Sequence, residues 1–147
     1  MKKIGLLLCF LTISLLTGCG GKNKLVCESK KDENTYVTVK YDFTFDNDKV
    51  DYYDLEFTYD FTDIEDLTKL GCESLSECIE KSKNTLNKCL EEESLENCKI
   101  TKEEETRVVI TANVTEDYLN SDSTDFTRKT TKDEIIKVLE AQDFTCK

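Results

Sequence analysis

The chain has 147 residues, of which 20 are Lys or Arg and 31 are Asp or Glu, so its formal net charge is −11. It contains no His, no Pro and no Trp. Without histidine, Ser-His-Asp triads, Cys-His dyads and imidazole metal ligands are excluded. A strongly acidic chain also argues against binding to a phosphate backbone, so we expect no nucleic-acid partner. The length suits one domain.

The first 18 residues have the plan of a secretory signal peptide. Lys2 and Lys3 form a basic start, and a largely apolar run follows over 4–16. A membrane span needs ~20 apolar residues, so this run is too short to be one. We therefore expect residues 1–18 to direct export and to be removed.

The end of this segment, Leu16-Thr17-Gly18-Cys19, resembles the lipobox of bacterial lipoproteins. In that family the cysteine thiol accepts a diacylglyceryl group, and a peptidase cuts before the cysteine. The resemblance implies lipidation of Cys19, with 19–24 as a short tether that anchors an extracytoplasmic protein to the cell membrane. Two or three acyl chains suffice to hold a protein on a bilayer stably. The alternative is an ordinary signal peptide with an incidental cysteine.

Six further cysteines lie within 25–147, which we interpret as a single extracytoplasmic domain. An even number of cysteines in an exported domain predicts a disulfide framework. Cys27 and Cys146 stand beside the two ends of this domain, and domain termini are often close together, so we expect these two to pair. The other four are Cys72, Cys78, Cys89 and Cys98.

Two pairings of these four cysteines stay open. In the first pairing, Cys89 bonds to Cys98 and Cys72 bonds to Cys78. This pairing is compatible with a continuous helix between Cys78 and Cys89. Such a helix separates its two cysteines by about 16 Å, which is too far for them to bond to each other. In the second pairing, Cys78 bonds to Cys98 and Cys72 bonds to Cys89. This pairing requires the helix to break near Asn84.

A metal or redox role is the alternative interpretation of these cysteines. The chain contains no CxxC, which zinc knuckles and disulfide oxidoreductases usually carry. No Gly-rich phosphate loop or GxSxG elbow follows the signal peptide either. We therefore predict a protein that is not an enzyme and that has no cofactor or metal.

Two runs of alternating apolar and polar residues, 37–45 and 53–61, predict a β-hairpin with one buried face. Both apolar sets occupy odd positions, so cross-strand partners on one face must have numbers with an even sum. This parity predicts a loop with an odd number of residues. A three-residue connection, Asn47-Asp48-Lys49, with a bulge meets the condition. A shorter strand over 25–29 is expected to precede the hairpin.

Three capping-box patterns predict helix starts. Thr62-x-x-Glu65 is expected to open a short helix that Gly71 stops, Ser74-x-x-Glu77 a longer one, and Thr131-x-x-Glu134 a third. The longer helix has one predicted buried face, made by Leu75, Cys78, Ile79, Ser82, Leu86, Cys89 and Leu90.

The remaining segments complete the predicted fold. Residues 98–101 and 106–115 resemble a second hairpin, and 116–130 a polar loop. Phe144-Thr145-Cys146 is expected to return the chain to the first strand. This order of elements predicts an α+β fold: an antiparallel sheet of about five strands, with two or three helices packed on one face and disulfide staples.

The polar face of the first hairpin supplies the candidate binding residues. Asp42, Asp54, Glu56 and Asp60 lie on it. Tyr36 and Tyr52 form an aromatic pair among these acids, and the alternative for them is packing against a helix or over the sheet edge. The simplest interpretation is a solvated, charged face that opposes edge pairing. The alternative is recognition of a cationic partner such as a basic peptide.

A divalent metal at Asp46, Asp48 and Asp51 is a further alternative. These acids lie around the predicted hairpin turn. The run lacks the glycine and the terminal glutamate of an EF-hand loop, so it supports calcium binding only weakly.

Several features together resemble small bacterial lipoproteins of the YehR-like group, which has no established activity. They are the lipobox, the short tether, Leu25-Val26-Cys27, the hairpin tip Phe45-Asp46-Asn47-Asp48-Lys49-Val50 and the terminal Phe144-Thr145-Cys146-Lys147. We therefore predict a lipid-anchored lipoprotein that serves as a non-enzymatic binding domain at the cell envelope, with a cationic peptide or an envelope protein as its partner. The alternatives are a structural envelope protein without a discrete ligand and a cysteine-based redox or metal-binding protein.

Overall fold

The computed structural model of the chain describes residues 23–31, 35–123 and 125–147. The predicted signal peptide, 1–18, and the predicted lipidation site, Cys19, lie outside the described residues. Among the described residues, no helix is both long and apolar enough to cross a membrane.

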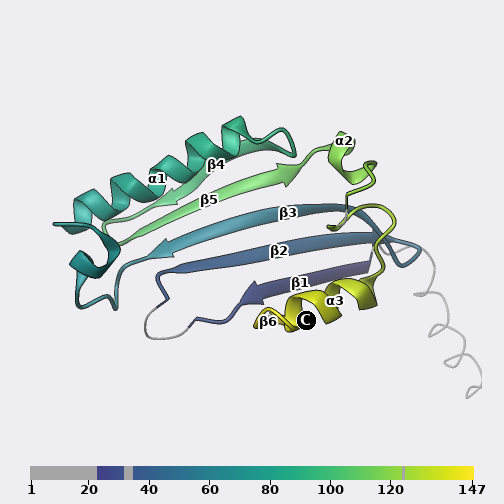
Figure 1. Cartoon of the computed structure of the whole chain (residues 1–147), viewed down its shortest axis with the longest axis horizontal. Coiled ribbons are helices and arrows are strands. Elements are labelled where there is room, and N and C mark those ends of the chain that lie inside the picture. The colour runs from purple at the N-terminus through teal and green to yellow at the C-terminus, as the bar shows by residue number, and fades with distance from the viewer. Residues whose placement is uncertain (1–22, 32–34, 124) are drawn as a thin grey trace, which may run out of the picture.

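One antiparallel sheet of six strands forms the body of the domain, in the order β4-β5-β3-β2-β1-β6 (Figure 1). The strands are β1 Asn23–Ser29, β2 Val37–Asp46, β3 Lys49–Asp60, β4 Leu95–Glu103, β5 Arg107–Val114 and β6 Phe144–Cys146. The predicted α+β class is confirmed. The sixth strand is the predicted returning segment, β6, which pairs with β1.

The helices all lie on one side of this sheet. They are the 3₁₀ helix η1 Leu67–Leu70, and α1 Leu75–Glu91, α2 Glu116–Leu119 and α3 Lys132–Glu140. In Figure 1, α1 runs along β4 and β5, and α3 lies beside β1 and β6. Ile79 of α1 shares a buried cluster with Ile110, and Ile135 of α3 shares one with Phe43.

The strand register places these two clusters on the same face. Phe43 lies opposite Tyr53 on β3, and Phe57, also at an odd position of β3, lies opposite Ile110. Odd positions of one regular strand stretch point to one side. We call this side the helix face and the other side the open face.

Two of the three predicted helix starts are confirmed. The Ser74 side chain accepts a hydrogen bond from the backbone N–H of Glu77, and that of Thr131 accepts one from Glu134. The carboxylate of Glu134 in turn accepts the backbone N–H of Thr131 at 2.8 Å, which completes a capping box.

The predicted start at Thr62 is wrong. The backbone N–H of Thr62 bonds to the carboxylate of Asp60 at 3.1 Å, and η1 begins only at Leu67, with Asp66 as its N-cap. Gly71 ends η1 as predicted, because it adopts the left-handed conformation with φ 74°.

The parity of the first hairpin is confirmed, but its turn is not the predicted one. Phe43 pairs with Tyr53, whose numbers have an even sum, yet the turn has two residues, Asn47 and Asp48, with φ 46° and 68°. The extra residue lies in β3 instead: the register shifts between Thr44 and Phe45, so that Thr44 lies opposite Tyr52 and Phe45 opposite Val50. This bulge restores the register that a two-residue turn alone would have broken.

Three disulfides join all six cysteines of the domain. The expected bond between Cys27 and Cys146 is present, with the two residues directly opposite each other on β1 and β6 and their Cα atoms 4.1 Å apart. The others are Cys72–Cys78 and Cys89–Cys98. The alternative pairing is wrong because α1 runs unbroken from Leu75 to Glu91.

The described residues of the predicted polar loop, 116–123 and 125–130, are docked on the helix face. It contains α2, whose Leu119 is 1% exposed, and Thr127, which is 2% exposed. Phe126 packs against the core between them. Leu90, by contrast, is 65% exposed, so its predicted place on the buried face of α1 is wrong.

Candidate functional site

The predicted acids lie on the open face, but lysine and asparagine side chains that donate hydrogen bonds or carry positive charge lie beside them. Asp54 lies opposite Asn113, and Glu56 opposite Lys40. The contacts are Lys40 Nζ to Glu56 at 2.8 Å, Lys24 Nζ to Asp42 at 4.0 Å, and the Asn113 amide donating to Asp54. The face is therefore largely compensated in charge rather than uniformly negative.

One pair of acids on this face is incompletely compensated. Asp42 and Asp54 lie directly opposite each other on β2 and β3. The Oδ1 atom of Asp42 is buried and has no hydrogen-bond partner among the described residues. Like charges directly opposite across strands are destabilising, so this pair reduces the stability of the hairpin.

The predicted aromatic pair is not assembled. Tyr52 lies near the hairpin tip, opposite Thr44, and is 38% exposed. Tyr36 lies at the other end of the hairpin, where its carbonyl accepts the N–H of Asp60 at 2.8 Å and its ring stacks on Phe61 at 5.6 Å. The two tyrosines therefore cannot form one recognition patch.

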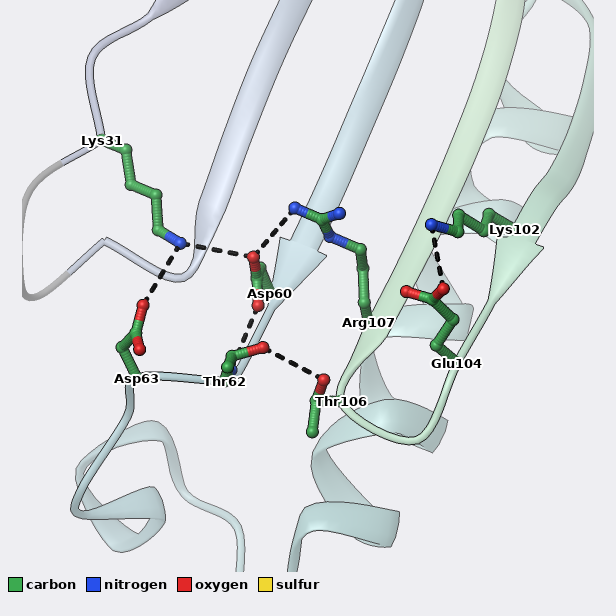
Figure 2. A network of polar contacts seen from close by, with 8 residues as sticks. All are labelled: Lys31, Asp60, Thr62, Asp63, Lys102, Glu104, Thr106 and Arg107. Carbon is green, nitrogen blue, oxygen red and sulfur yellow. Dashed lines mark hydrogen bonds and ion pairs between the residues drawn. The ribbon is translucent and has the colours of Figure 1, made fainter.

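Asp60 organises the end of the open face away from the hairpin tip. Its carboxylate contacts Arg107 Nη2 at 3.0 Å and Lys31 Nζ at 3.3 Å, and it accepts the N–H of Thr62 at 3.1 Å (Figure 2). Burial raises the pKa of Asp60, but the hydrogen bonds from Thr62 and Lys31 and the charge of Lys31 outweigh it and lower that pKa to about 2. The ionised carboxylate thus ties the segment after β1 to β3 and β5.

A polar hollow of about 440 Å³ surrounds this network. Its charged lining residues are Glu28, Glu56, Asp60, Lys31, Lys102 and Arg107. Three acids face three cations, and Lys102 also pairs with Glu104 at 2.9 Å (Figure 2). The hollow has no excess charge with which to select a ligand.

The acids near the hairpin tip do not gather into a metal site. Asp51 pairs with Arg128 Nη1 at 2.9 Å, and Arg128 Nη2 binds Glu116. Across 23–31, 35–123 and 125–147, no group of three or more Cys, Asp or Glu side chains is arranged to hold a metal ion.

The helix face contains a larger cleft of about 740 Å³, between α3, the docked residues 118–123 and 125–130, and the start of β4. About half of its lining residues are aromatic or aliphatic, among them Tyr41, Tyr53, Leu55, Val114, Tyr118, Phe126, Val138 and Leu139, and the others are polar or charged. Its rim carries the charged residues Asp122, Asp125, Lys129 and Glu134. We call this site the aromatic cleft. Its volume is within the usual range for small-molecule sites.

Phe126 fixes the aromatic wall of the cleft. Its ring makes edge contacts with Tyr41, Phe43 and Tyr53, at centroid distances of 5.9, 5.3 and 6.3 Å and interplanar angles of 88°, 86° and 79°. Edge-to-face packing of this kind is favourable and directional. A segment predicted as a loop from the sequence therefore supplies an aromatic ring that packs into the site.

Three phenol groups share the environment of Asp125. The Tyr118 hydroxyl donates to the Asp125 carboxylate at 2.9 Å. Burial, followed by the charge of Asp125, raises the pKa of Tyr41. Burial, followed by interactions with Tyr118, Tyr41 and Asp125, raises the pKa of Tyr53. All three phenols are therefore neutral at physiological pH.

Sequence reasoning missed this cleft. Tyr41 and Tyr53 occupy core positions of the alternation, and Tyr118 and Phe126 lie far along the chain in a polar segment. One signal was present: tyrosine at a buried strand position places a hydroxyl in the core, and a buried hydroxyl needs a polar neighbour. That requirement pointed to polar groups on the helix face.

No known family model matches the sequence, and no curated protein matches it. The fold is similar to a solved structure described as "NMR structure of the protein from Streptococcus pneumoniae TIGR4". The two chains share 11% sequence identity and a TM-score of 0.50, and the match covers 100% of this chain and 98% of the other. At this identity the likeness concerns the fold alone.

Proposed function

We propose that this chain is a lipid-anchored extracytoplasmic lipoprotein, related to the YehR-like group, whose domain is a non-enzymatic binding module at the cell envelope. Its ligand site in this proposal is the aromatic cleft. The single observation that carries the binding role is that cleft, a site of about 740 Å³ whose lining combines aromatic rings with polar groups.

The disulfides support the proposed compartment. All six cysteines of the domain are paired, and disulfides persist in oxidising environments outside the cytoplasm. The lipobox at 16–19 supports the lipid anchor.

The fold also suggests how an anchored domain would be oriented. Asn23 comes four positions after Cys19, so the chain between them reaches at most about 14 Å. Asn23 pairs with Phe45 next to the hairpin tip. A lipid on Cys19 would therefore hold the hairpin tip close to the membrane and direct the Asp60 network away from it.

The anchor is tested by comparing Cys19→Ala with Cys9→Ala. Both cysteines lie near the N-terminus, but only Cys19 ends the lipobox. We expect the wild-type protein and Cys9→Ala to incorporate labelled palmitate and to fractionate with membranes. Cys19→Ala should lose both properties. Label that persists in Cys19→Ala would contradict the proposed anchor.

The binding role is tested by a thermal-shift screen of the purified mature protein against peptides, glycans and small organic molecules. A specific ligand raises the melting temperature by mass action. Val138→Lys places a long positively charged side chain on the wall of the cleft and should abolish the shift, whereas Leu90→Lys changes an exposed leucine of α1 outside it. A shift that both variants retain would exclude the cleft as the site.

A further inference from the structure

The aromatic cleft combines aromatic lining residues with an excess of negative charge. Three acids on its rim, Asp122, Asp125 and Glu134, face one cation, Lys129. Lys129 Nζ already contacts Asp122. The cleft thus retains an excess of two negative charges, while its polar counterpart on the open face has none.

Asp125 is the acid best placed to attract a ligand. Its carboxylate accepts a hydrogen bond from the Tyr118 hydroxyl at 2.9 Å, and its backbone N–H donates one to the Ser123 hydroxyl at 3.2 Å. No Lys or Arg among the described residues forms an ion pair with it. The Asp125 carboxylate is therefore held in place by neutral groups, and its negative charge is available to a ligand at the rim of the cleft.

The aromatic groups favour the same sign of ligand charge. Ring faces carry the negative part of the aromatic quadrupole and attract cations within about 6 Å of the ring centre. Tyr41, Tyr53 and Tyr118 line the same cleft, and a phenol oxygen can accept a hydrogen bond from an N–H group. Aliphatic side chains at Leu55, Val114 and Val138 offer apolar surface beside them.

We propose that the aromatic cleft binds a small organic ammonium ion, that is, a positively charged amine attached to an apolar body. The ammonium group lies beside Asp125 and the phenol oxygens of Tyr41, Tyr53 and Tyr118. The apolar body packs against the aliphatic wall. This inference rests on the proposed function of the cleft as a ligand site and adds the chemical class of the ligand.

A matched pair of probes isolates the charge. Phenethylammonium and 2-phenylethanol have nearly the same shape, but only the first is a cation. We would titrate both into the purified mature protein in non-ionic detergent, by calorimetry and by aromatic NMR shifts. The expected result is at least tenfold tighter binding of phenethylammonium, with shifts centred on Tyr41, Tyr53, Tyr118 and Phe126. High salt should reduce this preference.

Two variants assign that preference to its source. Asp125→Asn should reduce the preference for the cation to less than about threefold, while Glu105→Gln, an acid in the turn between β4 and β5, should leave it unchanged. Unchanged NMR shifts outside the cleft would verify that both variants are folded.

Each other outcome is decisive. Equal binding of the two probes, or a preference that survives Asp125→Asn, would overturn the ammonium inference. If Val138→Lys abolished binding of both probes in that case, the cleft would stand as the ligand site. Absence of binding by either probe would overturn the ammonium inference, and the thermal-shift screen would then decide on the cleft by itself.

Discussion

The two faces of the sheet use charge in different ways. On the open face, acids are paired across neighbouring strands, as in Glu56 with Lys40 and Asp60 with Arg107. On the helix face, the rim of the aromatic cleft keeps acids in excess over a core of aromatic rings. Compensated charges stabilise a surface but give it little selectivity, whereas uncompensated charges beside aromatic rings favour a ligand of opposite sign.

The two faces also respond to opposite extremes of pH. Asp60 on the open face has a lowered pKa of about 2, so its contribution to stability is lost in acid. Tyr41 and Tyr53 on the helix face have raised pKa values, so their contribution is lost in alkali. Variants on each face should separate these two sensitivities.

The largest expected effect concerns the disulfide buried under the helix face. Replacing Cys27 and Cys146 together by alanine removes a bond with a sequence separation of 119 and should lower the free energy of unfolding by about 5 kcal/mol. The same double replacement at Cys72 and Cys78, with a separation of 6, should cost about 2 kcal/mol. Urea unfolding of the two double variants measures the difference. Equal losses would contradict a mechanism based on loop closure.

A large aromatic side chain in the core gives the next effect. Phe43 is 0% exposed and contacts the rings of Tyr41, Phe45, Tyr53 and Phe126. Phe43→Ala should lower the free energy of unfolding by about 3–5 kcal/mol, because a cavity remains. Leu90→Ala is the control, and at 65% exposure it should change that free energy by no more than about 0.5 kcal/mol. Comparable losses in the two variants would show that Phe43 is not a core residue.

Asp60→Asn tests the ion-pair network of the open face. Near neutral pH it should lower the free energy of unfolding by about 2 kcal/mol, since the pKa of Asp60 falls from 3.8 to about 2 on folding. This contribution is complete above pH 3.8 and is lost as the pH falls through 2. The wild-type and variant curves should therefore converge between about pH 4 and pH 2 in urea unfolding. A difference that stays constant over this range would exclude the carboxylate charge as its cause.

Tyr53→Phe tests the helix face at the opposite extreme. The folded state raises the pKa of Tyr53 above its ordinary value of 10.0, so the resulting stability is complete below that pH and falls as the pH rises further. At neutral pH the variant should differ from wild type by no more than about 1 kcal/mol. Above pH 10 the wild-type protein should lose stability more steeply than the variant, as followed by chemical unfolding. Parallel slopes would rule out a buried phenol at this position.

The smallest expected effect is that of the surface pair Lys40–Glu56. Its atoms are 2.8 Å apart, but both side chains are about one-third exposed, at 34% and 32%. A double-mutant cycle with Lys40→Ala and Glu56→Gln should give a coupling of less than about 1 kcal/mol that decreases with added salt. A larger, salt-independent coupling would mean that the open face is more buried in solution than the fold implies.

Local patterns in the sequence predicted most of the fold. The alternation of apolar and polar residues predicted β2 and β3. The capping-box patterns predicted the starts of α1 and α3, at Ser74 and Thr131. These features depend on residues within a few positions of each other. The bond between Cys27 and Cys146 followed from a general property of domain termini.

Features that depend on distant residues were not predictable in the same way. Asp60 acquires its partners from 29 and 47 positions away, at Lys31 and Arg107. The aromatic cleft brings Phe126 onto Tyr41 and Tyr53 through tertiary packing that no local pattern encodes. The prediction of the hairpin turn was wrong for another reason. The parity of the apolar positions alone cannot distinguish a three-residue loop from a two-residue turn with a bulge at Asp51.

The central claim, an exported, lipid-anchored and disulfide-stapled binding domain, is tested most directly by the intact mass of the protein recovered from cell membranes. Alkylation of free thiols before the measurement distinguishes closed from open disulfides. We predict a chain that begins at an acylated Cys19 and takes up no alkylating reagent. A chain that retains residues 1–18 and is alkylated at the domain cysteines would contradict the account.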